Sequence, residues 1–217
     1  VSQLGYPVVL KTTRGGYDGK GQVVLKSPEN LLEAEQLLEN HECVLEKWID
    51  FEKEISVIVT RSITGETTTF PVAENIHVNN ILHQSIVPAR VSSDTAEKAK
   101  AIALKIADAL KLVGTLAVEM FLAGDGEIYV NELAPRPHNS GHYTIDACET
   151  SQFEQHIRAI CGWPLGKTAL LQPVVMVNIL GQHLEKSIAN IRRFDNCKLH
   201  LYGKKEAKHN RKMGYLN

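Results

Sequence analysis

Two acidic residues, Glu119 and Glu132, lie in strand-like segments on either side of the dipeptide Asp125-Gly126. Asp-Gly is typical of a two-residue hairpin turn, which here would pair Gly124 with Glu127. The same register places Glu119 directly opposite Glu132. Two like charges facing each other about 5 Å apart destabilise a sheet, so this register requires something that offsets the repulsion.

A bound divalent cation would offset it, and carboxylate oxygens are ligands that suit Mg²⁺. Asn131, next to Glu132, offers a neutral oxygen to the same ion. The alternative is a hairpin of different register, in which both acids lie in solvent. The sequence therefore predicts a magnesium site whose existence depends on the register.

A glycine-rich segment, KTTRGGYDGKGQ at residues 11–22, lies between two short β-rich runs. It is not a P-loop, because Lys20 is followed by Gly21 rather than by Ser or Thr, and Val24 replaces the last glycine of the dinucleotide fingerprint. Glycine N–H groups can approach an anion closely, and Lys11 and Lys20 carry charges suited to phosphate. We interpret the segment as a flap over an anion; the alternative is a mobile hairpin tip with solvated charges.

The segment EKWIDFEKE has an acid on each side of an apolar stretch, at Glu46 and Glu54. The edge of a strand at Lys47, Trp48 and Ile49 can offer backbone groups to an adenine, and a carboxylate can accept ribose hydroxyls. Acids at strand ends are more often simply solvated, so this segment indicates a nucleotide only together with the flap and the paired acids.

These side chains must be positioned by an alternation of strands and helices. We expect strands at 6–11, 21–26, 43–50, 54–60, 67–74, 83–91, 115–122 and 127–133, and helices at 27–40, 93–113, 151–161 and 184–194. Ser151 is the expected N-cap of the third helix, and Gly114 the expected C-cap of the second. A polar loop at 134–146 follows the second acid directly, and residues 168–217 are expected to form a small strand-rich module.

Composition limits the class of protein. The 217 residues are 43% hydrophobic with a formal net charge of −1, so no overall field attracts nucleic acid or a membrane. Four scattered cysteines without a C-x-x-C pair predict reduced thiols in an intracellular protein. No signal peptide or membrane-spanning run is visible. Because the chain starts without Met and enters a strand at once, we expect it to lack an N-terminal part.

Together, VVLKTTRGGYDGKGQ, VLEKWIDFEKEISV, EIYVNELAPRPHNSGHYTIDAC and HLYGKKEAKHNRKMGY resemble the ATP-grasp superfamily and, within it, the N5-carboxyaminoimidazole ribonucleotide synthases. The resemblance implies an α+β ATP-grasp fold, in which two α+β lobes grip ATP, followed by a small strand-rich C-terminal module. It places the ATP-grasp domain at 1–165 and the C-terminal domain at 166–217. One departure is a Gly-Tyr near the end, at Gly214 and Tyr215, where the family has Gly-His.

The resemblance also implies a role for each candidate residue. The implied nucleotide contacts are Lys11, Gly16, Tyr17, Asp18, Gly19, Lys20, Gly21, Gln22, Glu46, Lys47, Trp48, Ile49, Glu54, His77, Asn131 and Glu132. The implied metal ligands are Glu119 and Glu132; the implied catalytic residues are Tyr17, Lys20, Arg136 and His138; the implied substrate ligands are Arg136, His138, Asn139, Ser140, Lys204 and Arg211.

The implied reaction is the carboxylation of 5-aminoimidazole ribonucleotide in purine biosynthesis, with ATP, Mg²⁺ and bicarbonate, by way of carboxyphosphate. His138 then either moves a proton or binds a carboxylate. The implied protein is a cytoplasmic homodimer that binds small molecules, and neither nucleic acid nor a membrane. The alternatives are another ATP-grasp ligase, biotin-carboxylase-like or formate-using, and a module that binds ATP and catalyses nothing.

The basic tail at 198–212 holds six Lys or Arg residues against one Glu. A nucleic-acid patch would require a platform of stacking aromatic side chains, and aromatic residues are sparse there. A local phosphate clamp fits better, and a solvated basic face is the alternative.

Overall fold

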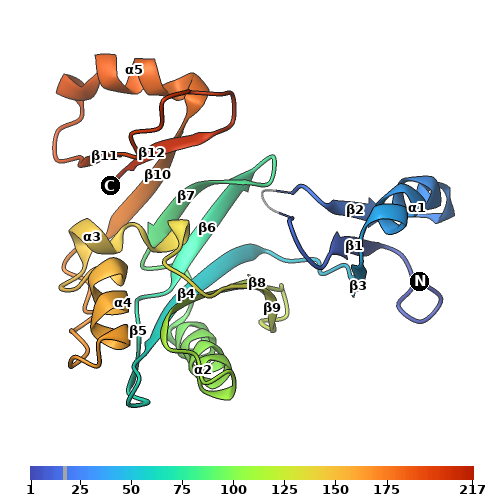
Figure 1. Cartoon of the computed structure of the whole chain (residues 1–217), viewed down its shortest axis with the longest axis horizontal. Coiled ribbons are helices and arrows are strands. Elements are labelled where there is room, and N and C mark those ends of the chain that lie inside the picture. Colours follow the sequence, from blue (N-terminus) through green and yellow to red (C-terminus); the bar gives the residue numbers. More distant parts are fainter. Residues whose placement is uncertain (17–18) are drawn as a thin grey trace. The chain divides into compact units, whose positions relative to one another are not determined.

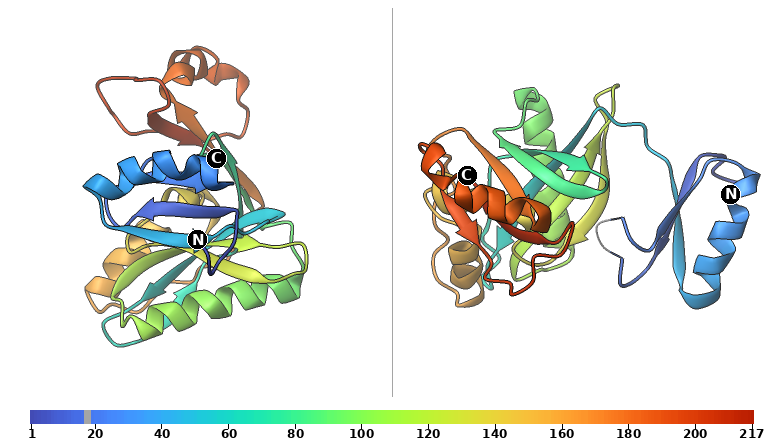
Figure 2. Two further views of the ribbon diagram at one scale, coloured as in Figure 1. Left: turned by 90° about the vertical axis from the view of Figure 1, so that its right-hand side faces the viewer. Right: turned by 90° about the horizontal axis from the view of Figure 1, so that it is seen from above.

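The computed structural model describes residues 1–16 and 19–217. These residues form two compact units, Val1–Asp50 with Val78–Ile81, and Phe51–His77 with Leu82–Asn217 (Figures 1 and 2). Each unit is described by itself below. Within the described residues, no helix is both long enough and apolar enough to cross a bilayer.

The small unit is a three-stranded antiparallel sheet with one helix. The strand order is β2 (Gln22–Leu25), β1 (Val8–Thr12), β3 (Cys43–Lys47), and a short turn of 3-10 helix, η1 (Pro28–Asn30), leads into α1 (Leu31–Asn40). Val8, Leu10, Leu25 and Ala34 form the buried core between sheet and helix. The glycine-rich segment connects the antiparallel strands β1 and β2, as the sequence predicts.

The large unit is built on one nine-stranded sheet. Its order is β11-β12-β10-β7-β6-β4-β8-β9, and β5 pairs with β4 beside this path. The strands are β4 (Lys53–Arg61), β5 (Thr67–Thr69), β6 (Ala73–Val78), β7 (Ile81–Val87), β8 (Gly114–Leu122), β9 (Ile128–Ala134), β10 (Val174–Leu180), β11 (Leu199–Leu201) and β12 (Lys212–Leu216). The strands after residue 166 thus continue the same sheet, and a domain boundary at 165/166 stays a prediction.

Helices cover both faces of this sheet (Figures 1 and 2). The alanine stripe of α2 (Ser93–Ala109) packs on Ile55, Val57 and Val59 of β4. On the opposite face, α3 (Thr144–Ala147) and α4 (Gln152–Ile160) cover only one end, where Ile58 packs with Tyr143. A 3-10 turn, η2 (Asn139–Gly141), precedes α3. The remaining helical elements, η3 (Gly181–His183), α5 (Leu184–Ala189) and η4 (Ile191–Arg193), lie between β10 and β11.

Most expected elements are present, with some differences. The helix expected at 27–40 divides into η1 and α1. The run at 67–74 divides into β5 and β6, and the fourth helix divides into α5 and η4. Helix α2 ends at Ala109, and Lys111 adopts the left-handed conformation (φ 49°), so Gly114 is not its C-cap. Gly114 instead begins β8 at φ 110°, where a Cβ would lie 2.8 Å from Cε1 of His156. The N-cap at Ser151 is confirmed, since its hydroxyl accepts from the N–H of Glu154.

A buried carboxylate joins three segments of the large unit. Glu74 on β6 is 5% exposed and accepts from the guanidinium and backbone N–H of Arg90, and its Oε2 lies 3.3 Å from Nζ of Lys53. The bonds from Arg90 lower the pKa of Glu74 to about 2, against the opposing effect of burial. A pKa lowered in the folded state stabilises the fold above the unfolded pKa and loses that effect as pH falls.

We therefore expect Glu74→Gln to lower the free energy of unfolding by about 2–3 kcal/mol at pH 7, because the shift is worth about 1.4 kcal/mol per pKa unit. The difference from the unsubstituted protein should shrink to less than about half at pH 3. Urea unfolding at both pH values measures this difference, and Glu97→Gln, at an exposed position of α2, is the control. An equal difference at both pH values would contradict the assigned pKa.

Candidate active site

The structure confirms that Glu119 on β8 lies opposite Glu132 on β9. The predicted turn, however, is wrong. Ala123 pairs with Glu127 around a three-residue loop, so the register near the turn differs by one residue from the two-residue model. A β-bulge between Glu119 and Met120 compensates for this difference and restores the pair.

The bulge inserts Asn131 as an extra residue between the partners of Glu119 and Met120. Bulges of this kind increase the local twist and re-aim side chains, and they are common beside active sites. Asn131 is the residue predicted to add a neutral oxygen to the metal site. Its position in the bulge is therefore a feature of the site and not a defect of the sheet.

The two acids differ in environment. The side chain of Glu119 is 13% exposed, whereas Glu132 is exposed. Burial, followed by the charge of Glu132, raises the pKa of Glu119 to about 7. His138 lies close by, with Nδ1 3.6 Å from Oε1 of Glu119. Ligand atoms of these three residues all lie within 4.8 Å of one another. A buried carboxylate with a raised pKa, beside a second carboxylate, fits a divalent cation, whose charge would stabilise the ionised form of Glu119 in place of a proton.

A third carboxylate, that of Glu54, lies on the same face of the sheet. Alternation along β4 places Glu54 and Ser56 on one face, and Ser56 pairs across to Glu119. Nδ1 of His77, from β6, lies 2.9 Å from Oε2 of Glu54. Burial opposes the charged form of His77, but the carboxylates of Glu54 and Glu119 outweigh this and raise its pKa above the usual value. Glu54 and His77, both predicted to contact the nucleotide, thus form an ion pair on the face of the sheet that carries Glu119 and Glu132.

The same face also carries a buried polar chain that the sequence did not predict. Asn75, opposite Glu54, donates to the hydroxyl of Ser56 (2.9 Å) and accepts from that of Ser85 (2.8 Å). All three residues are at most 5% exposed. Polar residues at inward-facing positions of three strands are the signal in the sequence that could have identified them.

The loop after β9 brings its predicted residues to the same site. Nδ1 of His138 accepts from the backbone N–H of Ser140 (3.3 Å) and lies 3.0 Å from its hydroxyl. Burial and the charge of Arg136 lower the pKa of His138 to about 3. The ring is therefore neutral with its proton on Nε2, because Nδ1 acts as the acceptor.

The next residue of the loop, Asn139, pairs its amide reciprocally with the amide of Asn178 on β10, at 3.1 and 3.0 Å. Asn178 also donates to the carbonyl of Leu82. Ser140 is fully buried, so its hydroxyl orients His138 in this structure. Direct contacts of Asn139 and Ser140 with a substrate stay predictions.

In the tail, Lys204 and Arg211 are the two residues predicted to bind a phosphate. Nζ of Lys204 donates to the carbonyl of Lys212 (2.7 Å) and lies 5.0 Å from the ring centre of Tyr202. Burial and the charges of Arg211 and Lys212 lower the pKa of Lys204. Arg211 lowers the pKa of Lys204 because the two positive charges repel each other. Two cations close enough to interact are what a phosphate clamp requires.

In the small unit, Nζ of Lys11 on β1 lies 2.7 Å from Oε2 of Glu46 on β3. This contact joins the predicted phosphate lysine to the predicted adenine strand. The side chain of Thr12 lies under the flap, where a Cβ on Gly21 would come within 2.6 Å of its hydroxyl. The predicted site residues Tyr17 and Asp18 lie outside the described residues.

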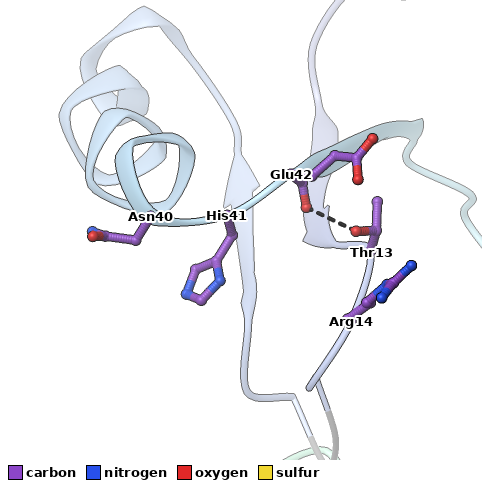
Figure 3. Close-up of a pocket in the computed structure, with 5 residues that line it drawn as sticks. All are labelled: Thr13, Arg14, Asn40, His41 and Glu42. Carbon is purple, nitrogen blue, oxygen red and sulfur yellow. Dashed lines mark hydrogen bonds between the residues drawn. The ribbon is translucent and has the colours of Figure 1, made fainter.

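A separate hollow lies on the small unit, between the end of β1 and the loop from α1 to β3 (Figure 3). Its lining residues are Thr13, Arg14, Asn40, His41 and Glu42, and none of them is a predicted site residue. The hydroxyl of Thr13 donates to the carbonyl of Glu42 across it (Figure 3). This bond holds the first residues after β1 to the start of β3 and so anchors the base of the flap.

We expect Glu119→Gln and Glu132→Gln each to lower Mg²⁺-dependent nucleotide affinity by at least about tenfold, because each removes one charged oxygen ligand. Calorimetric titration of nucleotide with and without Mg²⁺ measures the effect. Glu127→Gln, an exposed acid of the same hairpin, is the matched control. If both site variants retain the affinity of the control, Glu119 and Glu132 do not hold the metal.

Comparison with known proteins agrees with this geometry. Residues 1–153 match the ATP-grasp domain, and residues 174–217 match the phosphoribosylaminoimidazole carboxylase C-terminal domain. The chain is 60% identical over 216 residues to the N5-carboxyaminoimidazole ribonucleotide synthase of Bacillus subtilis, covering 100% of this chain and 57% of that protein.

Solved structures show the same similarity. An ADP complex of an N5-carboxyaminoimidazole ribonucleotide synthetase has a TM-score of 0.96 and 68% identity, over 100% of this chain and 57% of the other. The Aspergillus clavatus enzyme in complex with ADP and 5-aminoimidazole ribonucleotide has a TM-score of 0.91 and 36% identity, over 99% and 57%. The chain thus spans about 57% of the length of these relatives and is homologous to them.

These findings confirm the predicted α+β architecture and the resemblance on which it rested. With an acid pair across a bulged hairpin, a glycine flap between two strands and a family match over most of its length, the chain belongs to the ATP-grasp family.

Proposed function

We propose that the protein carrying this chain carboxylates 5-aminoimidazole ribonucleotide with ATP and bicarbonate, releasing ADP and phosphate. The observation that carries the proposal is the position of the loop 136–140 directly beside the acid pair. Nδ1 of His138 lies 3.6 Å from Glu119, so groups suited to a small anion adjoin groups suited to a metal nucleotide. A relative of this fold has been solved with ADP and 5-aminoimidazole ribonucleotide together.

The first step is the attack of a bicarbonate oxygen on the γ-phosphorus of ATP, which gives ADP and carboxyphosphate. Phosphoryl transfer depends on alignment and charge neutralisation rather than on covalent help from the protein. Mg²⁺, held by Glu119 and Glu132 with Asn131 beside them, would neutralise charge on the phosphates when bound. Lys11 and Lys20 supply fixed positive charge, and Glu54 accepts the ribose hydroxyls with His77 holding its carboxylate.

His138 serves in this proposal as a hydrogen-bond donor. Its Nδ1 accepts from the backbone of Ser140, which leaves Nε2–H available to an anionic oxygen. A neutral donor of this kind binds bicarbonate or carboxyphosphate without taking its proton. The guanidinium of Arg136 adds a planar pair of donors suited to the same carboxylate.

In the second step the exocyclic amine of the ribonucleotide attacks the carboxyl carbon of carboxyphosphate, or CO₂ released from it, and phosphate leaves. Lys204 and Arg211 are the proposed ligands of the ribonucleotide phosphate. Water destroys carboxyphosphate, so the flap at 16–22 is proposed to exclude it. Assembly as a homodimer and a location in the cytoplasm stay predictions from the resemblance.

In a protein of the relatives' full length, we expect full-rate ADP release to require both bicarbonate and 5-aminoimidazole ribonucleotide. A coupled assay for ADP, with each substrate omitted in turn, measures this dependence. Formate and biotin in place of the two substrates are the controls for other ATP-grasp ligases. ATP turnover that is indifferent to the ribonucleotide would rule out the proposed substrate.

We expect Arg136→Ala to lower kcat by about 10²-fold or more while the Kd for ATP changes less than about threefold, because the guanidinium acts on the carboxylate and not on the nucleotide. Steady-state kinetics and ATP titration give the two numbers. Arg158→Ala, a partly exposed arginine of α4 outside the loop 136–140, is the control. Equal losses in turnover and in nucleotide affinity would place Arg136 on the nucleotide instead.

A further inference from the structure

One fully buried side chain holds the loop that carries His138. Gln152, the first residue of α4, is 0% exposed. Its Oε1 accepts from the backbone N–H of His138 (2.9 Å), and its Nε2 donates to the backbone carbonyl of the same residue (2.7 Å). His138 is extended at φ −124° and ψ 155°, so the amide pairs with it as a neighbouring strand would.

The orientation of this amide is fixed by its neighbours. Nε2 also lies 3.1 Å from Nδ1 of His142, which gives it two acceptors on one side. A flipped amide would direct Nε2 at the N–H of His138, donor against donor. The contact also explains Gly141, where a Cβ would lie 2.5 Å from Oε1 of Gln152.

The backbone of Gln152 is tied to the same loop. Its N–H donates to the hydroxyl of Thr144 (2.9 Å), and that hydroxyl donates to the carbonyl of Gly141 (2.7 Å). The carbonyl of Gln152 accepts from the hydroxyl of Thr115 on β8. The residue therefore connects β8, which carries Glu119, to the loop, which carries His138.

We infer, on the basis of the proposed function, that Gln152 is a positioning residue that sets the direction of the His138 ring toward bicarbonate and carboxyphosphate. It touches no reacting atom. It fixes the peptide groups on both sides of the Cα of His138, and the N–H of Ser140 then fixes the ring. Loss of this brace lets the ring rotate away from the position in which Nε2–H faces the substrate oxygen.

The same helix provides a matched control. Gln155, also 0% exposed, lies one turn further along α4 and makes the same double bridge, from Nε2 to the carbonyl of Gly166 (2.7 Å) and from the N–H of Gly166 to Oε1 (2.8 Å). Gly166 is outside the loop. Removing either amide costs two hydrogen bonds to backbone groups, and removing that of Gln152 also costs its contact with His142. Only Gln152 braces His138.

The experiment compares Gln152→Met with Gln155→Met in a protein of the relatives' full length. Both variants should lose stability, with Tm lower by roughly 3–8 °C, because each leaves two buried backbone groups unpaired. Only Gln152→Met should lose kcat, by about 10–100-fold, with the KM for bicarbonate raised and the KM for ATP within about threefold. Equal kcat in the two variants, at equal folded fraction, overturns the inference.

A second readout is independent of the substrate. The ¹⁵N shifts of the His138 ring report which nitrogen carries the proton, and unsubstituted protein should show it on Nε2. Gln152→Met should mix the two tautomers or broaden the signals, whereas Gln155→Met should leave them unchanged. Unchanged ring signals in both variants overturn the inference. This result does not depend on the proposed function, because the signals are measured without substrate.

A third variant covers loss of folding in Gln152→Met. Gln152→Glu keeps an oxygen that accepts from the N–H of His138, and its protonated form keeps one donor. We expect the kcat of Gln152→Glu to lie between that of Gln152→Met and that of the unsubstituted protein. The change in the His138 ring signals should be smaller than in Gln152→Met. A Gln152→Glu protein whose ring signals equal those of the unsubstituted protein, but whose kcat falls by about tenfold or more, overturns the inference.

Discussion

The structure depends on one unfavourable contact, the opposition of Glu119 and Glu132 across β8 and β9. Two carboxylates cannot both be ionised at this separation without an opposite charge, and burial makes the cost larger for Glu119, whose pKa rises to about 7. A fold selected for stability alone would place an apolar residue at Glu119. The pair is therefore the clearest sign that this sheet holds a cation, and the flap, the Glu54–His77 pair and the 136–140 loop belong to one reaction only if it does.

The face of the sheet that carries the pair is divided along its length. Toward α3 and α4 it is closed by Ile58, Ala117 and Tyr143. Toward the other end, the same alternation of β4 and β8 presents Glu54, Ser56 and Glu119 instead. On the opposite face, Ile55, Val57 and Val59 all pack on α2. One face of the central strands thus packs against α2 and stabilises the fold. On the other face, one end is packed against helices and the other end carries the candidate site residues.

Much of this could be predicted from the sequence, and the hairpin shows why the prediction has a limit. The pairing of Glu119 with Glu132 follows from a two-residue turn, but the structure has a longer turn and a bulge at Asn131 that shift the register in opposite directions. A bulge has no signature in a single sequence, since it depends on the twist of neighbouring strands. Gly114 shows the same limit: its neighbour His156 is 42 residues away, so a contact rather than a helix cap determines it.

The buried amides were out of reach for a related reason. Gln152 and Gln155 read as ordinary polar positions of an amphipathic helix, and nothing in their spacing says that both are fully buried. Only the folded chain shows that each completes the hydrogen bonding of a backbone segment that belongs to no helix or strand. Side chains must complete the hydrogen bonding of a segment of this kind. Leaving a buried peptide group unpaired costs more free energy than burying the amide side chain that pairs with it. The loop that bears His138 can remain irregular, and so present Arg136 and His138 together, only because a helix supplies what a neighbouring strand would have supplied.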